Sequence, residues 1–382
     1  MPIDPVKDSV VAVSVYTASL PLSEPFEHAS SGLVDRLDEV IVKVATESSA
    51  VGWSEVRGNA PYVTGETMSR VVAAICDVFA PRLVAARLSS IAEIGRFLER
   101  AAMGNSTAKA AIDIAVHDAK ARALGVPLQD LLGGGGVEAL HVHGSMPFCA
   151  PDEAAARTRS YLDRGLTTIK VRVGLTHEAD LERIEAMRAA AASHPQGRAM
   201  RLAVDANQAW TAKEAIPRLR ELERHGLAWI EQPVRAGDIA GLREVRDAVG
   251  AMVVADESCG SPRDLLRLIE TRSADGFHFK LCKAGGIRNL MAMVSIAEAA
   301  GYPYIVGQMD EGMLATAAAL HCAAAANPFS CELWGYQRVG QQPFGGLEMV
   351  DGAMRMPARP GLGVTVDESA LKSVARFGAE GT

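Results

Sequence analysis

Three carboxylates close three successive apolar runs near the middle of the chain. Asp205 ends LAVD, Glu231 ends AWIE and Asp256 ends VVAD, at spacings of 26 and 25 residues. Each spacing is about one strand-plus-helix unit, so neighbouring parallel strands would present the three side chains to one point. Crowded carboxylates repel unless a cation lies among them, and hard oxygen ligands favour Mg²⁺, with Mn²⁺ as a substitute. We therefore predict a divalent metal site, with a salt-bridged cluster as the alternative.

Two lysines and an arginine are expected beside these acids. Period-two alternation places Lys170 and Arg172 on one face of their strand, and it turns Lys280 inward on a later strand. These strands are the second and sixth of eight, so a substrate would have cations on two opposite faces. Crowding by a cation and an arginine is expected to lower the pKa of Lys280 into the range of a general base. The alternative is a structural lysine that pairs with Asp256 or Glu231.

Further polar side chains are candidates for substrate contacts, each with a structural alternative. His28 lies in the segment Pro21–Gly32, which predicts a flexible loop, and Tyr62 lies in the loop GNAPYVTGE; both could cover the site. Glu332 and Trp334, at the end of the eighth strand, could bind an amino or quaternary ammonium group through charge and ring face. The remaining candidates are Ser145 on the first strand, Asn207 in VDANQAW and Asp310 after the seventh strand.

The elements that must position these residues follow two successive patterns. Residues 10–58 alternate as an antiparallel meander does, and residues 65–132 have a helical period that four glycines end, which predicts an α+β domain. After residue 138, short apolar strands alternate with amphipathic helices, and eight strands favour a closed barrel. An open doubly wound sheet has no nucleotide-binding fingerprint to support it. The predicted strands are Ala139–Ser145, Thr167–Arg172, Arg201–Asp205, Ala228–Glu231, Met252–Asp256, Gly276–Lys280, Tyr304–Gly307 and Ser330–Leu333.

Composition excludes several partners. The 382 residues include 39 Lys+Arg and 46 Asp+Glu, a net charge of −7 with no basic stretch, so nucleic acid is not an expected partner. No apolar run reaches the ~18–20 residues of a membrane span. Six cysteines lie far apart without a CxxC pair, and the first residues do not resemble a secretory leader. We expect a cytoplasmic protein without disulfides.

The motifs TIKVRVG, VDANQAW, IEQP, ADES and FKLCKAGG, in this order, resemble the enolase superfamily, and within it the muconate lactonizing enzyme-like subgroup of the mandelate racemase/muconate lactonizing enzyme family. The resemblance covers nearly the whole chain. It implies a modified TIM barrel, (β/α)7β, over residues 136–340, an N-terminal α+β capping domain over residues 1–135, and a C-terminal segment, 341–382, that returns to the cap. It also implies Mg²⁺ on Asp205, Glu231 and Asp256, an acid/base role for Lys280, a small carboxylate as substrate, and a homo-oligomer between a dimer and an octamer.

One position departs from the subgroup and bears on the reaction. The subgroup carries Lys-x-Lys on the second strand, with the second lysine as a base, where this chain has Arg172, which stays protonated. We therefore expect abstraction of a proton α to a carboxylate, through an enediolate, by Lys280 alone, as in a muconate cycloisomerase-like enzyme or a dehydratase. Lys170 would contact the substrate carboxylate or enolate oxygen. Racemisation or epimerisation of an amino acid derivative or dipeptide, with Lys170 as second base, is the alternative.

Two other classes of protein stay open at this point. A class I aldolase would use Lys280 as a Schiff-base nucleophile, but it has no need of three clustered carboxylates. Borohydride trapping with substrate would reveal it. A protein that only binds carboxylic acids would fail to exchange the proton of any carbon acid with solvent deuterium.

Overall fold

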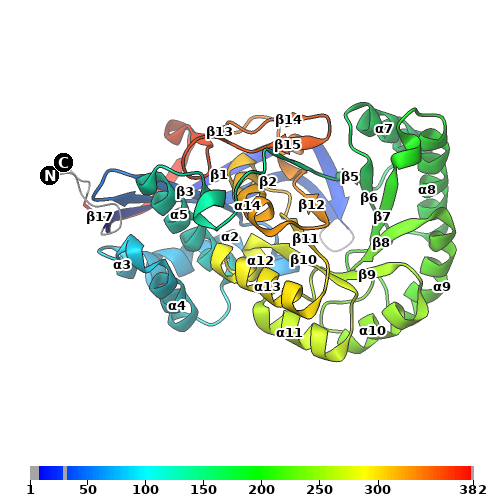
Figure 1. Cartoon of the computed structure of the whole chain (residues 1–382), viewed down its shortest axis with the longest axis horizontal. Helices are drawn as coiled ribbons and strands as arrows, with labels where there is room; N and C mark the ends of the chain where they lie inside the picture. Colours follow the sequence, from blue (N-terminus) through cyan, green and yellow to red (C-terminus); the bar gives the residue numbers. More distant parts are fainter. Residues whose placement is uncertain (1–7, 29–31, 380–382) are drawn as a thin grey trace.

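The computed structural model describes residues 8–28 and 32–379, which form two connected parts (Figure 1). The N-terminal strands and helices, drawn in blue and cyan, lie beside a barrel drawn in green to orange. Among the described residues no helix is both long and apolar enough to cross a membrane.

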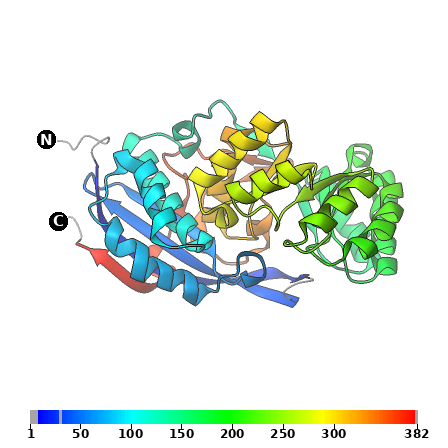
Figure 2. The ribbon, with the colours of Figure 1, turned by 90° about the horizontal axis from the view of Figure 1, so that it is seen from below.

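The first part is built on a four-stranded antiparallel sheet in the order β17-β1-β2-β3. Its strands are β1 (Val10–His28), β2 (Gly32–Thr46), β3 (Val51–Arg57) and β17 (Lys372–Gly378). The meander is confirmed, and the end of the chain adds its fourth strand (Figure 2). The prediction of a loop over Pro21–Gly32 is wrong for the residues of this segment that the structure describes, which belong to β1 and β2; residues 29–31 lie outside them. The prolines in this segment favour a loop. Strand β1 nevertheless continues through them: its pairing with β2 shifts register between Pro21 and Phe26, and the buried Phe26 then pairs with Val34.

Helices cover one face of this sheet. The longest, α5, is buried along most of its length and lies so close to β3 that a Cβ at Gly52 would overlap its backbone. Within the predicted helical stretch 65–132, the first long helical segment is divided by a π-helical turn, η1, between α2 and α3. The elements are α1 (Pro61–Thr64), α2 (Met68–Ala73), η1 (Ala74–Phe79), α3 (Ala80–Leu83), η2 (Leu88–Ser90), α4 (Ile91–Ala101), α5 (Ser106–Leu124) and α6 (Leu128–Leu131).

The second part is a ring of eight parallel strands in the order β5 to β12, confirming the (β/α)7β barrel. The His143 N–H donates to the Cys331 carbonyl (3.0 Å) where the first and last strands meet. The strands are β5 (Gly144–Met146), β6 (Thr168–Arg172), β7 (Arg201–Asp205), β8 (Leu227–Glu231), β9 (Met252–Ala255), β10 (Gly276–Lys280), β11 (Tyr304–Gly307) and β12 (Ser330–Glu332).

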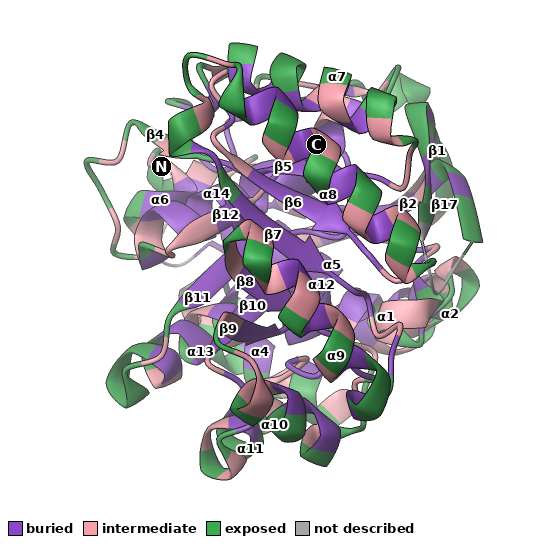
Figure 3. Cartoon of the chain, turned by 90° about the vertical axis from the view of Figure 1, so that its right-hand side faces the viewer, coloured by how far each residue is buried: buried purple, intermediate pink, exposed green. Residues whose placement is uncertain are grey.

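Helices surround this ring with their apolar faces inward, and Figure 3 shows the buried strands inside and exposed outer helix faces. They connect each strand to the next, and over residues 333–379, which the structure describes, no long helix follows β12. The helices are α7 (Pro151–Asp163), α8 (His177–Ala192), α9 (Ala212–Leu222), α10 (Ile239–Ala248), α11 (Pro262–Thr271), α12 (Leu281–Ala284), α13 (Ile287–Ala300) and α14 (Met313–Ala326).

The predicted first strand, Ala139–Ser145, is divided between two sheets. Its beginning, β4 (Ala139–His141), pairs antiparallel with β15 outside the barrel, and only β5 belongs to the ring. A continuous apolar alternation cannot reveal this change of partner. The remaining elements are η3 (Gly197–Ala199), η4 (Glu223–His225), η5 (Gly335–Arg338), β13 (Phe344–Gly345), β14 (Met349–Val350), β15 (Ala353–Arg355), β16 (Thr365–Val366) and η6 (Glu368–Ala370).

Candidate active site

Parallel register aligns the predicted residues at the carboxyl end of the barrel. Arg172 on β6 pairs with Asp205 on β7, which pairs with Glu231 on β8. Across the ring, Lys280 on β10 and Glu332 on β12 lie level with the same residue of β11. In barrels of this kind the active-site residues lie at the carboxyl ends of the strands. The side chains there converge on one point, whereas those inside the barrel form a packed core.

A cavity of about 30 Å³ lies among these strand ends, under the cap. The cap contributes two residues of the short helix α1, and the barrel contributes residues at or just after the ends of six strands. The lining residues are Tyr62, Val63, Lys170, Arg172, Asp205, Asn207, Asp256, Glu257, Lys280, Gln308, Met309, Asp310 and Glu332.

Lys170 is surrounded by three carboxylates. Its Nζ lies 2.6 Å from Glu231, 3.0 Å from Asp205 and 2.8 Å from Glu332, and the side chain is buried. Burial lowers the pKa of Lys170, but attraction to the three carboxylates outweighs it, so the pKa is raised well above its ordinary value. Lys170 is therefore a fixed positive charge in this arrangement.

Asp256 is held by two lysines. Lys280 Nζ lies 2.9 Å from its Oδ2, and Lys283 on α12 contacts its other carboxylate oxygen and, at 2.5 Å, its carbonyl. The expectation of a lowered pKa for Lys280 is not met: burial lowers it, yet attraction to Asp256, Glu332 and Glu231 raises it well above its ordinary value. Lys283 was not among the predicted site residues. It follows Lys280 by three residues, at the start of a helix, and this spacing could have indicated that both lysines lie near the same carboxylate.

A buried histidine joins the acidic cluster. His278 Nδ1 lies 3.0 Å from Glu231, and its Nε2 lies 3.4 Å from Glu332. Ligand atoms of these three residues lie within 4.8 Å of one another, a grouping that could hold a metal ion. This set shares only Glu231 with the predicted ligands. The ammonium group of Lys170 lies between the carboxylates of Asp205 and Glu231, and that of Lys280 contacts Asp256.

The site carries a surplus of negative charge that suits a divalent cation. Its acids are Asp205, Glu231, Asp256, Glu257 and Glu332, and its lysines are Lys170, Lys280 and Lys283. Burial and repulsion from the other acids raise the pKa of Asp205 to about 6, despite Lys170, and that of Glu257 to about 8. Oε2 of Glu257 is buried without a hydrogen-bond partner. Hard oxygen donors with uncompensated charge fit Mg²⁺.

Arg172 is held between the cap and the barrel. Its Nη2 lies 3.1 Å from Oδ2 of Asp310, its Nη1 donates to the Glu27 carbonyl (3.3 Å), and its guanidinium lies 4.5 Å from the centre of the Phe26 ring. The guanidinium of Arg338 also contacts this group of residues: it lies 5.1 Å from the centre of the Phe26 ring, and its Nη1 lies 3.8 Å from Oδ2 of Asp310. Both arginines are therefore immobilised around one carboxylate.

Four of the predicted substrate contacts line the cavity: Tyr62, Asn207, Asp310 and Glu332. The Asn207 N–H donates to Oδ1 of Asp205 (2.9 Å) and so orients that carboxylate. Glu332, expected to attract an ammonium group of a ligand, contacts the ammonium group of Lys170.

The other three candidates have different surroundings. Ser145 does not line the cavity, and its carbonyl accepts hydrogen bonds from Tyr161 and Arg338. Trp334 is buried outside the cavity, with its ring face covered by the guanidinium of Arg164 at 4.8 Å. The side chain of His28 lies outside the described residues.

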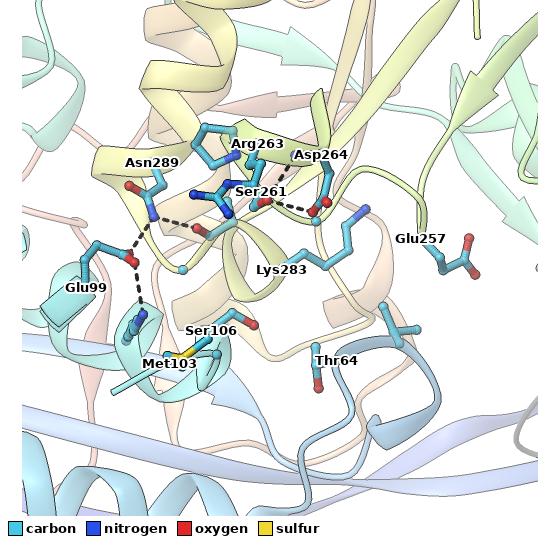
Figure 4. Close-up of a pocket in the computed structure, with 17 residues that line it drawn as sticks. Thr64, Glu99, Met103, Ser106, Glu257, Ser261, Arg263, Asp264, Lys283 and Asn289 are labelled. Atoms are coloured by element: carbon cyan, nitrogen blue, oxygen red, sulfur yellow. Dashed lines mark hydrogen bonds and ion pairs between the residues drawn. The ribbon is translucent and has the colours of Figure 1, made fainter. Parts of the chain in front are cut away.

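A larger cavity of about 590 Å³ opens between the cap and the barrel (Figure 4). It shares Val63 and Glu257 with the smaller one, so the two adjoin. Its wall carries both signs of charge, including a Lys109–Glu99 ion pair of 3.0 Å that Asn289 joins. No sequence motif predicted this cavity, because it forms where α4, α5, α11 and α12 meet.

Comparisons with known proteins agree with this architecture. Residues 10–133 match the N-terminal domain model of mandelate racemase / muconate lactonizing enzyme, and residues 153–370 match the enolase C-terminal domain-like model. The L-Ala-D/L-Glu epimerase of Bacillus subtilis is 35% identical over 93% of this chain and 96% of its own. A chloromuconate cycloisomerase of Pseudomonas putida is 31% identical over 97% and 100%. The structure of a dipeptide epimerase from Enterococcus faecalis, complexed with Mg and L-Leu-L-Tyr, superposes with a TM-score of 0.87 at 30% identity, covering 94% and 99%.

A capped (β/α)7β barrel with acids and lysines at its strand ends defines an enzyme of the enolase superfamily. Within it, the chain belongs to the mandelate racemase/muconate lactonizing enzyme family. The relatives named above are isomerases by their names.

Proposed function

We propose that the protein is a metal-dependent isomerase in which Lys280 removes the proton α to the carboxylate of a small substrate. The observation that carries the proposal is the placement of Lys280, on β10, at a cavity that also holds a surplus of carboxylates and a second buried ammonium group. Removal of such a proton creates a doubly charged enediolate, which needs positive charge close by.

Asp205, Glu231 and Asp256 are the proposed ligands of Mg²⁺. Their oxygen donors and burial, and the repulsion that raises the pKa of Asp205, support this choice, and the Mg-containing structure of the dipeptide epimerase supports the metal. A bound divalent cation supplies Lewis-acid stabilisation of the negative charge that develops on the substrate oxygens. Mn²⁺ has the same preference for oxygen ligands and is the proposed substitute.

Lys280 can accept a proton only as the neutral amine, and its ion pair with Asp256 favours the ammonium form instead. A divalent cation on Asp256 would share the charge of its carboxylate and so weaken the attraction that raises the pKa of Lys280; metal binding and base strength would then be linked. Lys170 then keeps its proton and places a fixed charge beside the developing oxyanion. The carboxylate of Glu332 contacts both amines.

The arrangement of cations supports transfer at one face of the substrate. The position that would carry a second lysine is Arg172, a group that does not deprotonate and is already bound to Asp310. Cycloisomerisation or a β-elimination proceeds with one base, so these reactions need no base beyond Lys280.

A second candidate is racemisation or epimerisation of an amino acid derivative or dipeptide, which the names of the relatives support better than they support the one-base reactions. The chloromuconate cycloisomerases match over the same length, so the relatives divide between the two chemistries. Both candidates share the α-proton step at Lys280.

Solvent exchange tests the shared step directly. The Mg²⁺-loaded protein in D₂O is incubated with muconates, dipeptides and N-acyl amino acids, and loss of the α-proton signal is followed by NMR. We expect exchange or turnover with at least one carboxylate. Borohydride trapping of a substrate on Lys280, without α-exchange, would instead indicate an aldolase.

A further inference from the structure

Strand β3 of the cap is hydrogen-bonded to the β11–α14 loop on both sides of Asp310. Arg57 Nη1 donates to the Met309 carbonyl (2.7 Å), and the Arg57 N–H donates to Oε1 of Glu311 (3.2 Å). The other oxygen of Glu311 accepts the Met309 N–H (3.1 Å). Met309 and Glu311, the residues before and after Asp310, are therefore both hydrogen-bonded to the buried Arg57.

A second attachment lies one turn further on. Glu55, also on β3, accepts the N–H groups of Gly312 (3.1 Å) and Ala315 (2.9 Å) at the start of α14. A Cβ at Gly312 would overlap the Glu55 carboxylate, and a Cβ at Gly335 would overlap the backbone of Asp310. The loop is thus enclosed on two sides, and at Gly335, where the overlapping atoms are backbone, the close approach requires glycine.

Asp310 occupies a conformation that needs such support. Its φ is +55°, in the left-handed region that a non-glycine residue rarely adopts unless its surroundings impose it. In this conformation its carboxylate reaches Arg172 (3.1 Å) and approaches Arg338 (3.8 Å).

We infer that Arg57 is a positioning residue for Arg172, acting through Asp310. The chain of contacts runs from Arg57 to Met309 and Glu311, then to the backbone of Asp310, and from its carboxylate to the guanidinium in the cavity. Docking of the cap onto the barrel therefore orients a cation of the proposed active site, although Arg57 itself does not line the cavity. This inference goes beyond the proposed function; only the kinetic test below rests on that function.

Arg57→Lys is the informative change, because it keeps the charge and the main-chain donor but loses the planar fork that reaches the Met309 carbonyl. Glu39→Gln is the matched control: Glu39 is the register partner of Arg57 on β2, equally buried, and its carboxylate oxygens have no hydrogen-bond partner. Thermal unfolding of both variants measures any general loss of stability.

The first readout needs no substrate. Phenylglyoxal modifies accessible arginines, and peptide mass spectrometry follows its rate at Arg172. Loss of a buried hydrogen bond to a charged group should release the loop and raise this rate about tenfold in Arg57→Lys. Asp310→Asn should raise it similarly, and Glu39→Gln should not. An unchanged rate in Arg57→Lys, with a raised rate in Asp310→Asn, would overturn the inference.

The second readout is a double-mutant cycle on kcat/KM for α-proton exchange. Displacement of a catalytic-site cation should cost about 10- to 100-fold in Arg57→Lys and in Asp310→Asn. If Arg57 acts through Asp310, the double variant should match Asp310→Asn within about twofold. Multiplied losses would show an independent, structural role and overturn the inference. Absence of exchange in the unmodified enzyme would contradict the proposed function alone, since the labelling test does not depend on it.

Discussion

Lys170 and Lys280 contact the two oxygens of a single carboxylate, that of Glu332, at 2.8 and 3.5 Å. The sequence placed these lysines on opposite faces of a substrate, because their strands lie half a barrel apart. In the structure Glu332 fills the space between their amines, so a substrate carbon cannot lie between them while these contacts persist. This relationship supports Lys170 as a fixed charge rather than as a second base.

Metal removal is the first prediction. Exhaustive EDTA treatment should abolish α-proton exchange, and Mg²⁺ should restore it, because the enediolate charge has no other divalent partner and Asp205 is crowded by like charges. Metal analysis of the treated protein confirms removal. Full activity in a sample shown to be metal-free would contradict the proposed site.

Replacement of Lys280 is the second prediction. Lys280→Ala should reduce exchange by about 10²–10⁴-fold, the usual contribution of a general base. Lys280→Arg keeps the charge but cannot deprotonate at neutral pH, so it should be similarly impaired. Lys213, exposed on α9, provides a control in Lys213→Ala. Unimpaired exchange in Lys280→Ala would assign the base to another residue.

The third prediction concerns pH and stability. Burial is the main cause that raises the pKa of Glu55 to about 8 and that of Glu39 well above its ordinary value, in a cluster with Glu311 around Arg57. The folded protein keeps protons here that the unfolded chain releases near pH 4.5, so the free energy of unfolding should fall as pH rises from about 5 to about 8.

Glu39→Gln tests this linkage, because its neutral amide cannot take part in the titration. Urea unfolding of the parent and the variant at intervals between pH 5 and 9 gives the two slopes. The parent should lose more stability with rising pH than Glu39→Gln does. Identical slopes would show that Glu39 ionises in the folded state much as it does in the unfolded chain.

Much of the fold was predictable because its signal is local. The apolar runs that end in Asp205, Glu231 and Asp256 mark both the strands and their carboxyl ends, and alternation alone turned Lys170 and Lys280 inward. Parallel register then brings these residues together without any further information.

What the sequence did not reveal depends on partners distant in the chain. The backbone pairing of Phe26 with Val34 places residues of an apparent loop in two paired strands, and Leu140 pairs outside the barrel with a strand about 200 residues later. Lys283 and Glu257 lie next to predicted residues, yet their burial beside Asp256 is visible only in three dimensions. Side-chain pairing across the barrel, such as that of Glu332 with two lysines, has no sequence period at all.

The most direct test of one-face chemistry at Lys280 is the stereochemical course in D₂O. Each enantiomer of a chiral carbon acid that exchanges is incubated separately with the Mg²⁺-loaded enzyme, and deuterium content and enantiomeric purity are followed together. With Arg172 in place of a second lysine, only one enantiomer should exchange or eliminate, and neither should lose purity. Rapid interconversion of the two enantiomers, with deuterium entering both, would contradict the account and establish a second competent base.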